Sequence, residues 1–208
     1  MAITKDFNNF GYIEHKFSEN ELAPIKLEIE ELKNNFNLGT SFNSKLVGNI
    51  EKEYALIKSK DYISDLMMPL ILEFEAKYGY LKSLDFLDKD VPIKLHEPWV
   101  NFQKKHEFNP AHNHKGVYSF VLWIDIPYSN EEEKQNISSK YSVFNIPGNF
   151  QFIYNDALGR TKVLCIPADK TYNNTAILFP AQLTHAVYPF YTSDDYRISV
   201  AGNFILQP

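Results

Sequence analysis

The stretch Phe108-Asn109-Pro110-Ala111-His112-Asn113-His114, with the apolar run Val117–Ile126 just after it, decides the fold prediction. The two histidines lie between an Asn-Pro turn signal and a run with the length and composition of a buried strand. If this segment is extended, His112 and His114 point to the same side, because side chains alternate along a strand with a period of two. Two imidazoles on one face can chelate one metal ion.

Two residues far along the chain extend this candidate site. His185 opens a second β-rich run, and Arg197 follows it by 12 residues. Arg197 and Ser199 fall on one face of the predicted strand Tyr196–Ile205. An arginine on an interior face needs a negative partner, because an unpaired buried charge is costly, and its fork matches a carboxylate. The alternative is a surface arginine paired with Asp194 or its neighbour Asp195.

The chain from Val91 onward has the pattern of an antiparallel sandwich or barrel. Turn residues separate short apolar runs, with no long helical pattern between them. A polar loop is expected at Glu131–Ser139. The predicted strands are Ile93–Leu95, Trp99–Gln103, Val117–Ile126, Tyr141–Phe144, Phe150–Tyr154, Lys162–Ile166, Thr175–Phe179, His185–Tyr188 and Tyr196–Ile205.

The N-terminal part predicts helices instead. Ser18-Glu19-Asn20-Glu21 has the form of a capping box, and apolar residues recur behind it at helical spacing. We expect one helix over Glu19–Asn35, a short one over Glu51–Ile57, and a third over Asp61–Tyr78 that Gly79 ends.

Length and charge limit the remaining possibilities. A chain of 208 residues can bury one core, and we expect a helical support region over 1–90 and a β core over 91–208, in a single compact unit. The net charge of −5 argues against a duplex nucleic-acid partner. The start lacks an apolar signal region and no run could span a bilayer, so a cytoplasmic protein without membrane contact is expected.

Together these features resemble the 2-oxoglutarate/iron(II)-dependent dioxygenases. The resemblance covers Trp99–Phe204, about half the chain, and implies a mainly β fold with N-terminal helices, a double-stranded β-helix of the jelly-roll or cupin-like kind. It is closest to the prolyl-hydroxylase-like branch and to a bacterial and phage group, so a phage-encoded origin is open. The matching positions are Trp99, Asn101, Asn109, Pro110, His112, His114, Ser119, His185, Val187, Pro189, Arg197, Ser199 and Asn203.

The resemblance implies roles for several of these residues. His112 and His185 are expected to bind iron(II), and Arg197 with Ser199 to hold the distal carboxylate of 2-oxoglutarate. Asn101 and Trp123 are the further cosubstrate contacts. Trp123 stands near the place where the branch often has a tyrosine, and its indole N–H can donate a hydrogen bond but cannot accept one.

His114 stands where the family usually has Asp or Glu. Three neutral imidazoles leave an iron site one negative charge short, although they still leave coordination positions free. We favour His112, His114 and His185 as the ligand set. The alternatives are a carboxylate from elsewhere, with candidates Glu107, Asp125 and Asp156, or a degenerate site that binds metal without turnover.

The implied activity is hydroxylation. Oxidative decarboxylation of 2-oxoglutarate by dioxygen would be coupled to C–H oxidation of a small-molecule or peptidyl substrate. Two alternatives are a three-histidine, cupin-like metalloenzyme that does not use 2-oxoglutarate, and a non-enzymatic β-sandwich binding protein. The segment Phe150–Asn174 either lines the substrate entrance or is an ordinary hairpin; its candidate lining residues are Tyr154, Asp156, Arg160 and Tyr172.

Overall fold

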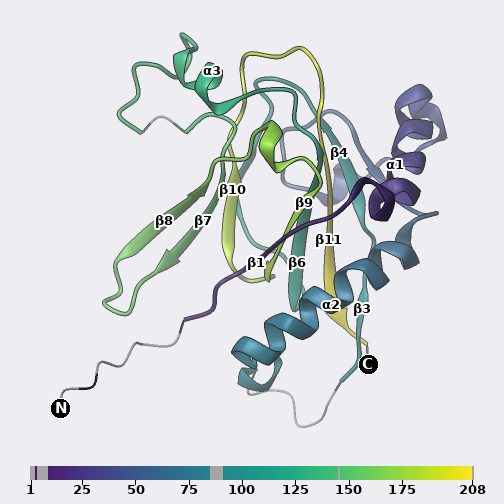
Figure 1. The fold of residues 1–208 in the computed structure, drawn as a ribbon, viewed down its shortest axis with the longest axis vertical. Coiled ribbons are helices and arrows are strands. Elements are labelled where there is room, and N and C mark those ends of the chain that lie inside the picture. The colour runs from purple at the N-terminus through teal and green to yellow at the C-terminus, as the bar shows by residue number, and fades with distance from the viewer. Residues whose placement is uncertain (1–2, 4–8, 85–90, 145, 208) are drawn as a thin grey trace.

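Two antiparallel sheets form the centre of the molecule (Figure 1). The computed structural model describes residues 3, 9–84, 91–144 and 146–207. In the large sheet the order is β1 (Ile13–Lys16), β9 (Thr175–Pro180), β6 (Tyr118–Asp125), β11 (Arg197–Leu206), β4 (Trp99–Gln103) and β2 (Glu53–Ala55), and β3 (Ile93–Leu95) also pairs with β11. In the small sheet the order is β5 (Asn109–His112), β10 (Thr184–Val187), β7 (Phe150–Asn155) and β8 (Thr161–Ile166).

Two helices, α1 (Glu19–Asn34) and α2 (Lys60–Tyr78), pack on the outer face of the large sheet (Figure 1). The expected capping box begins α1, since the Ser18 hydroxyl accepts from the Glu21 N–H and the Glu21 carboxylate accepts from the Ser18 N–H. Gly79 ends α2 in the left-handed conformation, with φ +57°. Both helices therefore begin and end close to where the sequence predicts.

The alternation of side chains along the central strands sorts the core into two layers. On β4 and β11, Val100, Phe102 and Val200 point outward and belong to the buried cluster that includes the helices. The residues between them, Asn101 and Ser199 among others, point toward the small sheet. Both faces of these strands are therefore covered, but only the inner face carries polar side chains.

Three local predictions are wrong. Residues 51–57 contain strand β2 rather than a helix, because Glu53–Ala55 pair with the edge of β4. Residues 131–139 are not all loop, because α3 (Asn130–Gln135) begins there on the Ser129 hydroxyl. Tyr141–Phe144 forms no strand; these side chains are exposed, and no sheet edge pairs with this segment in the described structure.

The N-terminal segment contributes more than helices. Strands β1 and β2 extend the two edges of the large sheet, and short 3-10 helices interrupt the connections. The boundary expected at residue 90 falls in 85–90, outside the described residues. None of the described helices combines the length and apolar character needed to cross a membrane. The 3-10 helices are η1 (Phe36–Leu38), η2 (Asn43–Lys45), η3 (Leu81–Ser83) and η4 (Lys170–Tyr172).

Candidate metal centre

Strand pairing in the small sheet brings the three histidines together. His112 on β5 lies directly opposite His185 on β10, and His114 follows two residues after His112, on the same side as the alternation predicts. The ring centroids are 4.3 Å apart for His112 and His185, 4.8 Å for His112 and His114, and 5.0 Å for His114 and His185. One ring nitrogen from each residue lies within 4.8 Å of the others, a spacing that one metal ion can bridge.

Backbone carbonyls orient two of the three rings. Nδ1 of His112 lies 2.7 Å from the Pro110 carbonyl oxygen, and Nδ1 of His185 lies 2.9 Å from that of Leu183. Because a carbonyl only accepts, Nδ1 of each ring is the protonated nitrogen and Nε2 offers its lone pair. Such a bond to the outer nitrogen is typical of histidines that bind metals, since it fixes the ring's tautomer and orientation.

Burial keeps these imidazoles uncharged at neutral pH. Removal from water lowers the pKa of His185 to about 3 and that of His114 to about 4, and in each case the neighbouring His112 adds a smaller like-charge effect. Burial also lowers the pKa of His112, against the bond to the Pro110 carbonyl, which raises it. The neutral form is the one that binds a metal ion, so all three rings are in the ligating state.

No described carboxylate is part of this cluster. Among the described residues, the group that could hold a metal consists of the three histidines alone. The candidate carboxylates have other partners. Glu107 accepts from the N–H groups of Glu51 and Lys104, Asp125 accepts from the Asn173 amide, and Asp156 pairs with Arg160. The structure therefore brings together the favoured set rather than a set with a carboxylate.

Arg197 is buried beside the cavity, with 1% of its surface exposed. The surface alternative is wrong, since Asp194 pairs with Lys105 instead. Tyr128 and Phe190 stack on each other, and the guanidinium carbon lies 5.9 and 5.5 Å from the two ring centroids. No described carboxylate pairs with the guanidinium, so its positive charge has no counterion within the described chain.

Neutral oxygens surround the guanidinium instead. Nη1 donates to the Tyr128 hydroxyl at 2.6 Å and to the Gly148 carbonyl at 2.8 Å, while Nη2 reaches the Tyr188 carbonyl at 3.2 Å. The side-chain oxygen of Gln103 accepts from both Nε, at 3.2 Å, and Nη2, at 2.7 Å. This Nε–Nη2 edge is one of the edges to which a carboxylate can bind in a bidentate pair, so Gln103 lies where an anionic ligand could contact Arg197.

The other predicted cosubstrate residues form a row across the inner face of the large sheet. Ser199 lies opposite Asn101 on one side and Trp123 on the other. The Asn101 amide donates to the Ser199 hydroxyl at 3.2 Å and accepts from the Trp99 indole at 3.1 Å. All of these side chains line the same cavity as the histidines.

Tyr128 and Gln103 are site residues that the sequence patterns missed. Tyr128 follows β6 in a loop, where no periodicity marks a buried side chain. Burial raises the pKa of its hydroxyl, against Arg197, so it stays protonated and donates to the Gly148 carbonyl at 3.1 Å. Gln103 could have been found from strand alternation, since it lies two residues after Asn101 on the same face; its position opposite Arg197 is set by the β4–β11 pairing.

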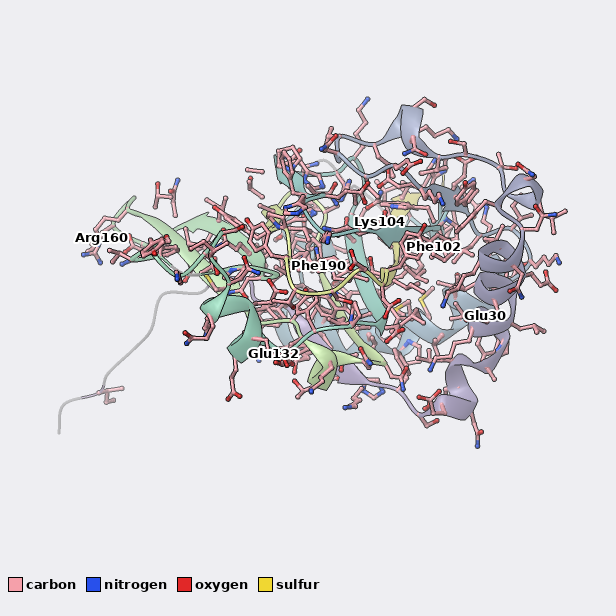
Figure 2. The ribbon with its side chains drawn as sticks, turned by 90° about the horizontal axis from the view of Figure 1, so that it is seen from above. Glu30, Phe102, Lys104, Glu132, Arg160 and Phe190 are labelled. Atoms are coloured by element: carbon pink, nitrogen blue, oxygen red, sulfur yellow. The ribbon has the colours of Figure 1, made fainter. Side chains whose placement is uncertain are left out.

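The cavity between the sheets has a volume of about 510 Å³, within the range of small-molecule sites. Buried residues such as His185 and Arg197 form its floor, and the exposed side chains of Lys45, Val47 and Glu97 form its mouth. Phe150, at the start of β7, lines it, whereas the candidate entrance residues Tyr154, Asp156, Arg160 and Tyr172 of the β7–β8 hairpin and the segment after it do not. Arg160 marks the tip of that hairpin, which projects from the body of the molecule (Figure 2).

Comparisons with known proteins agree with this arrangement. The model of the family described as "Putative 2OG-Fe(II) oxygenase" matches residues 97–203, about half of the chain. A Pseudomonas putida prolyl-4-hydroxylase has a similar fold, with a TM-score of 0.59 at 12% identity over 96% of this chain and 94% of that one. None of the curated proteins matches the chain.

Two further solved structures share the fold. The 2-oxoglutarate-dependent carbocyclase SnoK from nogalamycin biosynthesis has a TM-score of 0.55 at 10% identity, over 94% of this chain and 79% of that one. The viral collagen prolyl hydroxylase of Paramecium bursaria Chlorella virus-1, solved with 2-oxoglutarate, has a TM-score of 0.50 at 12% identity, over 93% and 94%. At such identities the likeness concerns the fold.

The fold and the site define a double-stranded β-helix protein with a metal-binding cluster and a buried cation between its sheets. The chain belongs to the 2-oxoglutarate- and iron(II)-dependent oxygenase family, and its cofactors are Fe(II) and 2-oxoglutarate. The residues present fit both groups, because three neutral imidazoles face one point and a buried guanidinium lacks an anion. The expected jelly-roll fold class and the expected oxygenase activity are thereby confirmed.

Proposed function

We propose that His112, His114 and His185 bind the iron(II) and that Arg197 holds the distal carboxylate of 2-oxoglutarate, with Ser199, Asn101 and Trp123 as further contacts. The observation that carries the proposal is the convergence of three neutral imidazoles on one point. When bound, the two cofactors supply the oxidising chemistry, in which dioxygen converts 2-oxoglutarate to succinate and carbon dioxide and a substrate C–H bond is hydroxylated. The substrate is a small molecule or a peptidyl side chain.

The chain's own residues bind, orient and exclude water. Carbonyl bonds to Nδ1 hold His112 and His185 with Nε2 toward the metal. Arg197 supplies a fixed positive charge on the cavity floor, where low polarity strengthens its attraction for a carboxylate. Phe150 stacks on the His185 ring, with centroids 5.4 Å apart, and Phe179 packs edge-on against it at 5.0 Å, which keeps water from that side.

The division into a support region over 1–90 and a core over 91–208 stays a prediction. The described residues of the N-terminal region support the prediction that this region and the β core form one compact unit. Its strands β1 and β2 continue the large sheet, and Phe42 and residues 45–48 line the cavity.

An anaerobic titration with Fe(II) and 2-oxoglutarate tests the assignment. We expect a metal-to-ligand charge-transfer band in the wild-type protein and its loss, with loss of bound metal, in the His112→Ala/His185→Ala variant. Arg197→Ala should retain metal but weaken 2-oxoglutarate binding at least tenfold, because a buried charge-assisted bond is removed. Arg160→Ala, which removes a surface arginine at the hairpin tip, is the matched control.

Circular dichroism and thermal unfolding show whether each variant is folded. A folded double-histidine variant that still gives the band would contradict the ligand assignment. A different result would favour the three-histidine enzyme that does not use this cosubstrate. In that case the wild type would not bind 2-oxoglutarate, and Arg197→Ala would bind metal as the wild type does.

A further inference from the structure

Glu53 is a buried carboxyl group on the wall of the cavity. It lies on β2, directly opposite Asn101 on β4, so the two side chains share the inner face of the large sheet. Only 1% of its surface is exposed, and it lines the same cavity as the histidines and Arg197. The expected cofactor contacts do not use it.

The hydrogen bonds of Glu53 are incomplete. Its Oε2 accepts from the Asn43 side chain at 3.3 Å, whereas its Oε1 is buried without a partner among the described residues. Two other buried glutamates behave differently. Both oxygens of Glu28 and both of Glu133 accept from backbone N–H groups, which accounts for their burial. Glu53 lacks such a structural explanation, and a buried acceptor without a partner is destabilising.

No cation of the described chain compensates this carboxyl. Asn43 and Asn101, which lie against it from η2 and β4, are uncharged, and the charged group that acts on it is Glu107. Burial, with a smaller contribution from the Glu107 carboxylate, raises the pKa of Glu53 to about 8. The side chain is therefore mostly protonated at neutral pH in the free protein, and a bound cation would favour its ionised form.

The surroundings of Glu53 favour a cation over a neutral group. Phe42 and Trp99 stack at 5.4 Å with an angle of 15° between their rings, and both line the cavity with Glu53. Aromatic faces attract ammonium and guanidinium groups. The rim cation Lys45 illustrates this attraction, because its Nζ lies 4.7 Å from the Phe42 ring centroid, but it pairs with Glu97 and makes no ion pair with Glu53. A carboxyl group beside aromatic rings, under the field of a second carboxylate, is complementary to a positive charge.

We propose that Glu53 binds a cationic nitrogen of the primary substrate, an ammonium or a guanidinium, and so selects substrates that carry a basic group. The inference rests on the proposed function, since it names the substrate class of that same cavity. Because Oε1 is shielded from bulk water, an ion pair formed there is stronger than one at the surface.

Binding of small probes to the protein loaded with Zn(II) and 2-oxoglutarate without oxygen tests the proposal. The probes are n-butylammonium and the neutral butyramide, and isothermal titration calorimetry in two buffers of different ionisation enthalpy measures affinity and proton release. We expect n-butylammonium to bind with release of a proton at pH 7, and to bind roughly 25-fold more tightly at pH 8.5 than at pH 6.5, because it requires the ionised carboxylate.

Two variants give the matched comparison. Glu53→Gln should weaken n-butylammonium binding at least tenfold and abolish its pH dependence. Glu51→Gln removes the same charge two residues away at an exposed position, and should change neither. Should Glu53→Gln fail to fold, the two probes decide on the wild type alone, since equal affinities for n-butylammonium and butyramide overturn the proposal.

The remaining outcomes are equally decisive. Butyramide binding as tightly as n-butylammonium would overturn the proposal in favour of a neutral substrate, and failure of n-butylammonium to bind would overturn it outright. The proposed function can fail independently of this inference. If the Fe(II)–2-oxoglutarate band is absent but n-butylammonium binding still depends on Glu53, the cofactor assignment is rejected and the cation site is retained.

Discussion

Gln103 and Arg197 illustrate how one residue can control access to a charge. The Gln103 oxygen accepts from both Nε and Nη2 of the guanidinium, on an edge that a carboxylate can occupy. The amide of Gln103 in turn donates to the Glu107 carbonyl at 2.5 Å. Binding of 2-oxoglutarate at this edge must displace the glutamine oxygen, so part of the binding free energy is spent on breaking these bonds.

The variant Gln103→Ala should therefore bind 2-oxoglutarate several-fold more tightly than the wild type. Without the cosubstrate the same variant should be less stable by about 1–3 kcal/mol, because two buried N–H groups lose their acceptor. Calorimetric titration and urea unfolding, each with and without 2-oxoglutarate, measure both effects. Gln135→Ala, at an exposed position of α3, is the control. Weaker binding by a folded Gln103→Ala would show that Gln103 supports the cosubstrate.

Glu53 should make the stability of the protein depend on pH. Its pKa is about 8 in the folded protein and near 4.5, the ordinary value of a glutamate, in the unfolded chain, so the folded state holds the proton more tightly. Stability is therefore greatest below pH 4.5 as far as this group is concerned, and falls as the pH rises toward 8. Glu53→Gln removes this loss and should be more stable than the wild type at pH 8.5, by about 1–3 kcal/mol.

Urea unfolding at pH 6 and pH 8.5 measures the effect. The difference between variant and wild type should be larger at the higher pH, and Glu51→Gln should show no such trend. An equal difference at both pH values would mean that Glu53 titrates normally.

At the scale of elements, α3 anchors the loop that leads into β11. Glu133 on α3 is fully buried and accepts from the backbone N–H groups of Tyr191 and Thr192 and from the Thr192 hydroxyl. The same loop contains Phe190, which stacks on Tyr128 beside the Arg197 guanidinium. The short helix thus positions a wall of the cosubstrate site from outside the cavity.

Glu133→Ala should lower the free energy of unfolding by about 2–3 kcal/mol, since charge-assisted bonds are lost and backbone N–H groups stay buried. Binding of 2-oxoglutarate should weaken as well, because the loop beside Arg197 loosens. Urea unfolding and calorimetric titration measure the two effects, with Glu131→Ala at an exposed position of the same helix as the control. Loss of stability with unchanged binding would mean that α3 does not position the site.

At the scale of the whole molecule, the proposed metal would connect segments far apart in the chain. His112 and His114 come from β5 and the residues after it, and His185 comes from β10. A ligand that binds only the folded state stabilises it by mass action, by about 2.7 kcal/mol at 100 times its dissociation constant. For a chain of 208 residues this corresponds to a rise in Tm of about 5–10 °C.

Removal of metal with a chelator should lower Tm by this amount and leave the fold intact, because the two hydrophobic clusters do not depend on the site. Differential scanning calorimetry of the protein with Fe(II) under nitrogen, before and after chelation, measures the change. The His112→Ala/His185→Ala variant should show no response to the chelator. An equal response in that variant would place the metal elsewhere.

Much of the molecule was determined by the sequence itself. Alternating apolar and polar residues along β4 and much of β11 specified strands with one face for the helices and one for the cavity, and the apolar run of β6 specified a buried strand. The capping box and Gly79 delimited the helices. The His-x-His pair on an extended segment predicted two rings on one side for the same reason. These features are local, since each depends on backbone periodicity or on a contact within a few residues.

The rest was decided by tertiary structure. Strand β2 forms because the edge of β4 is available to pair with it, not because of its own pattern. Tyr128 and Glu53 became site residues through contacts with Arg197 and through the face shared with Asn101. Their roles depend on neighbours that the chain brings close only when it folds, and no spacing along the sequence encodes such proximity.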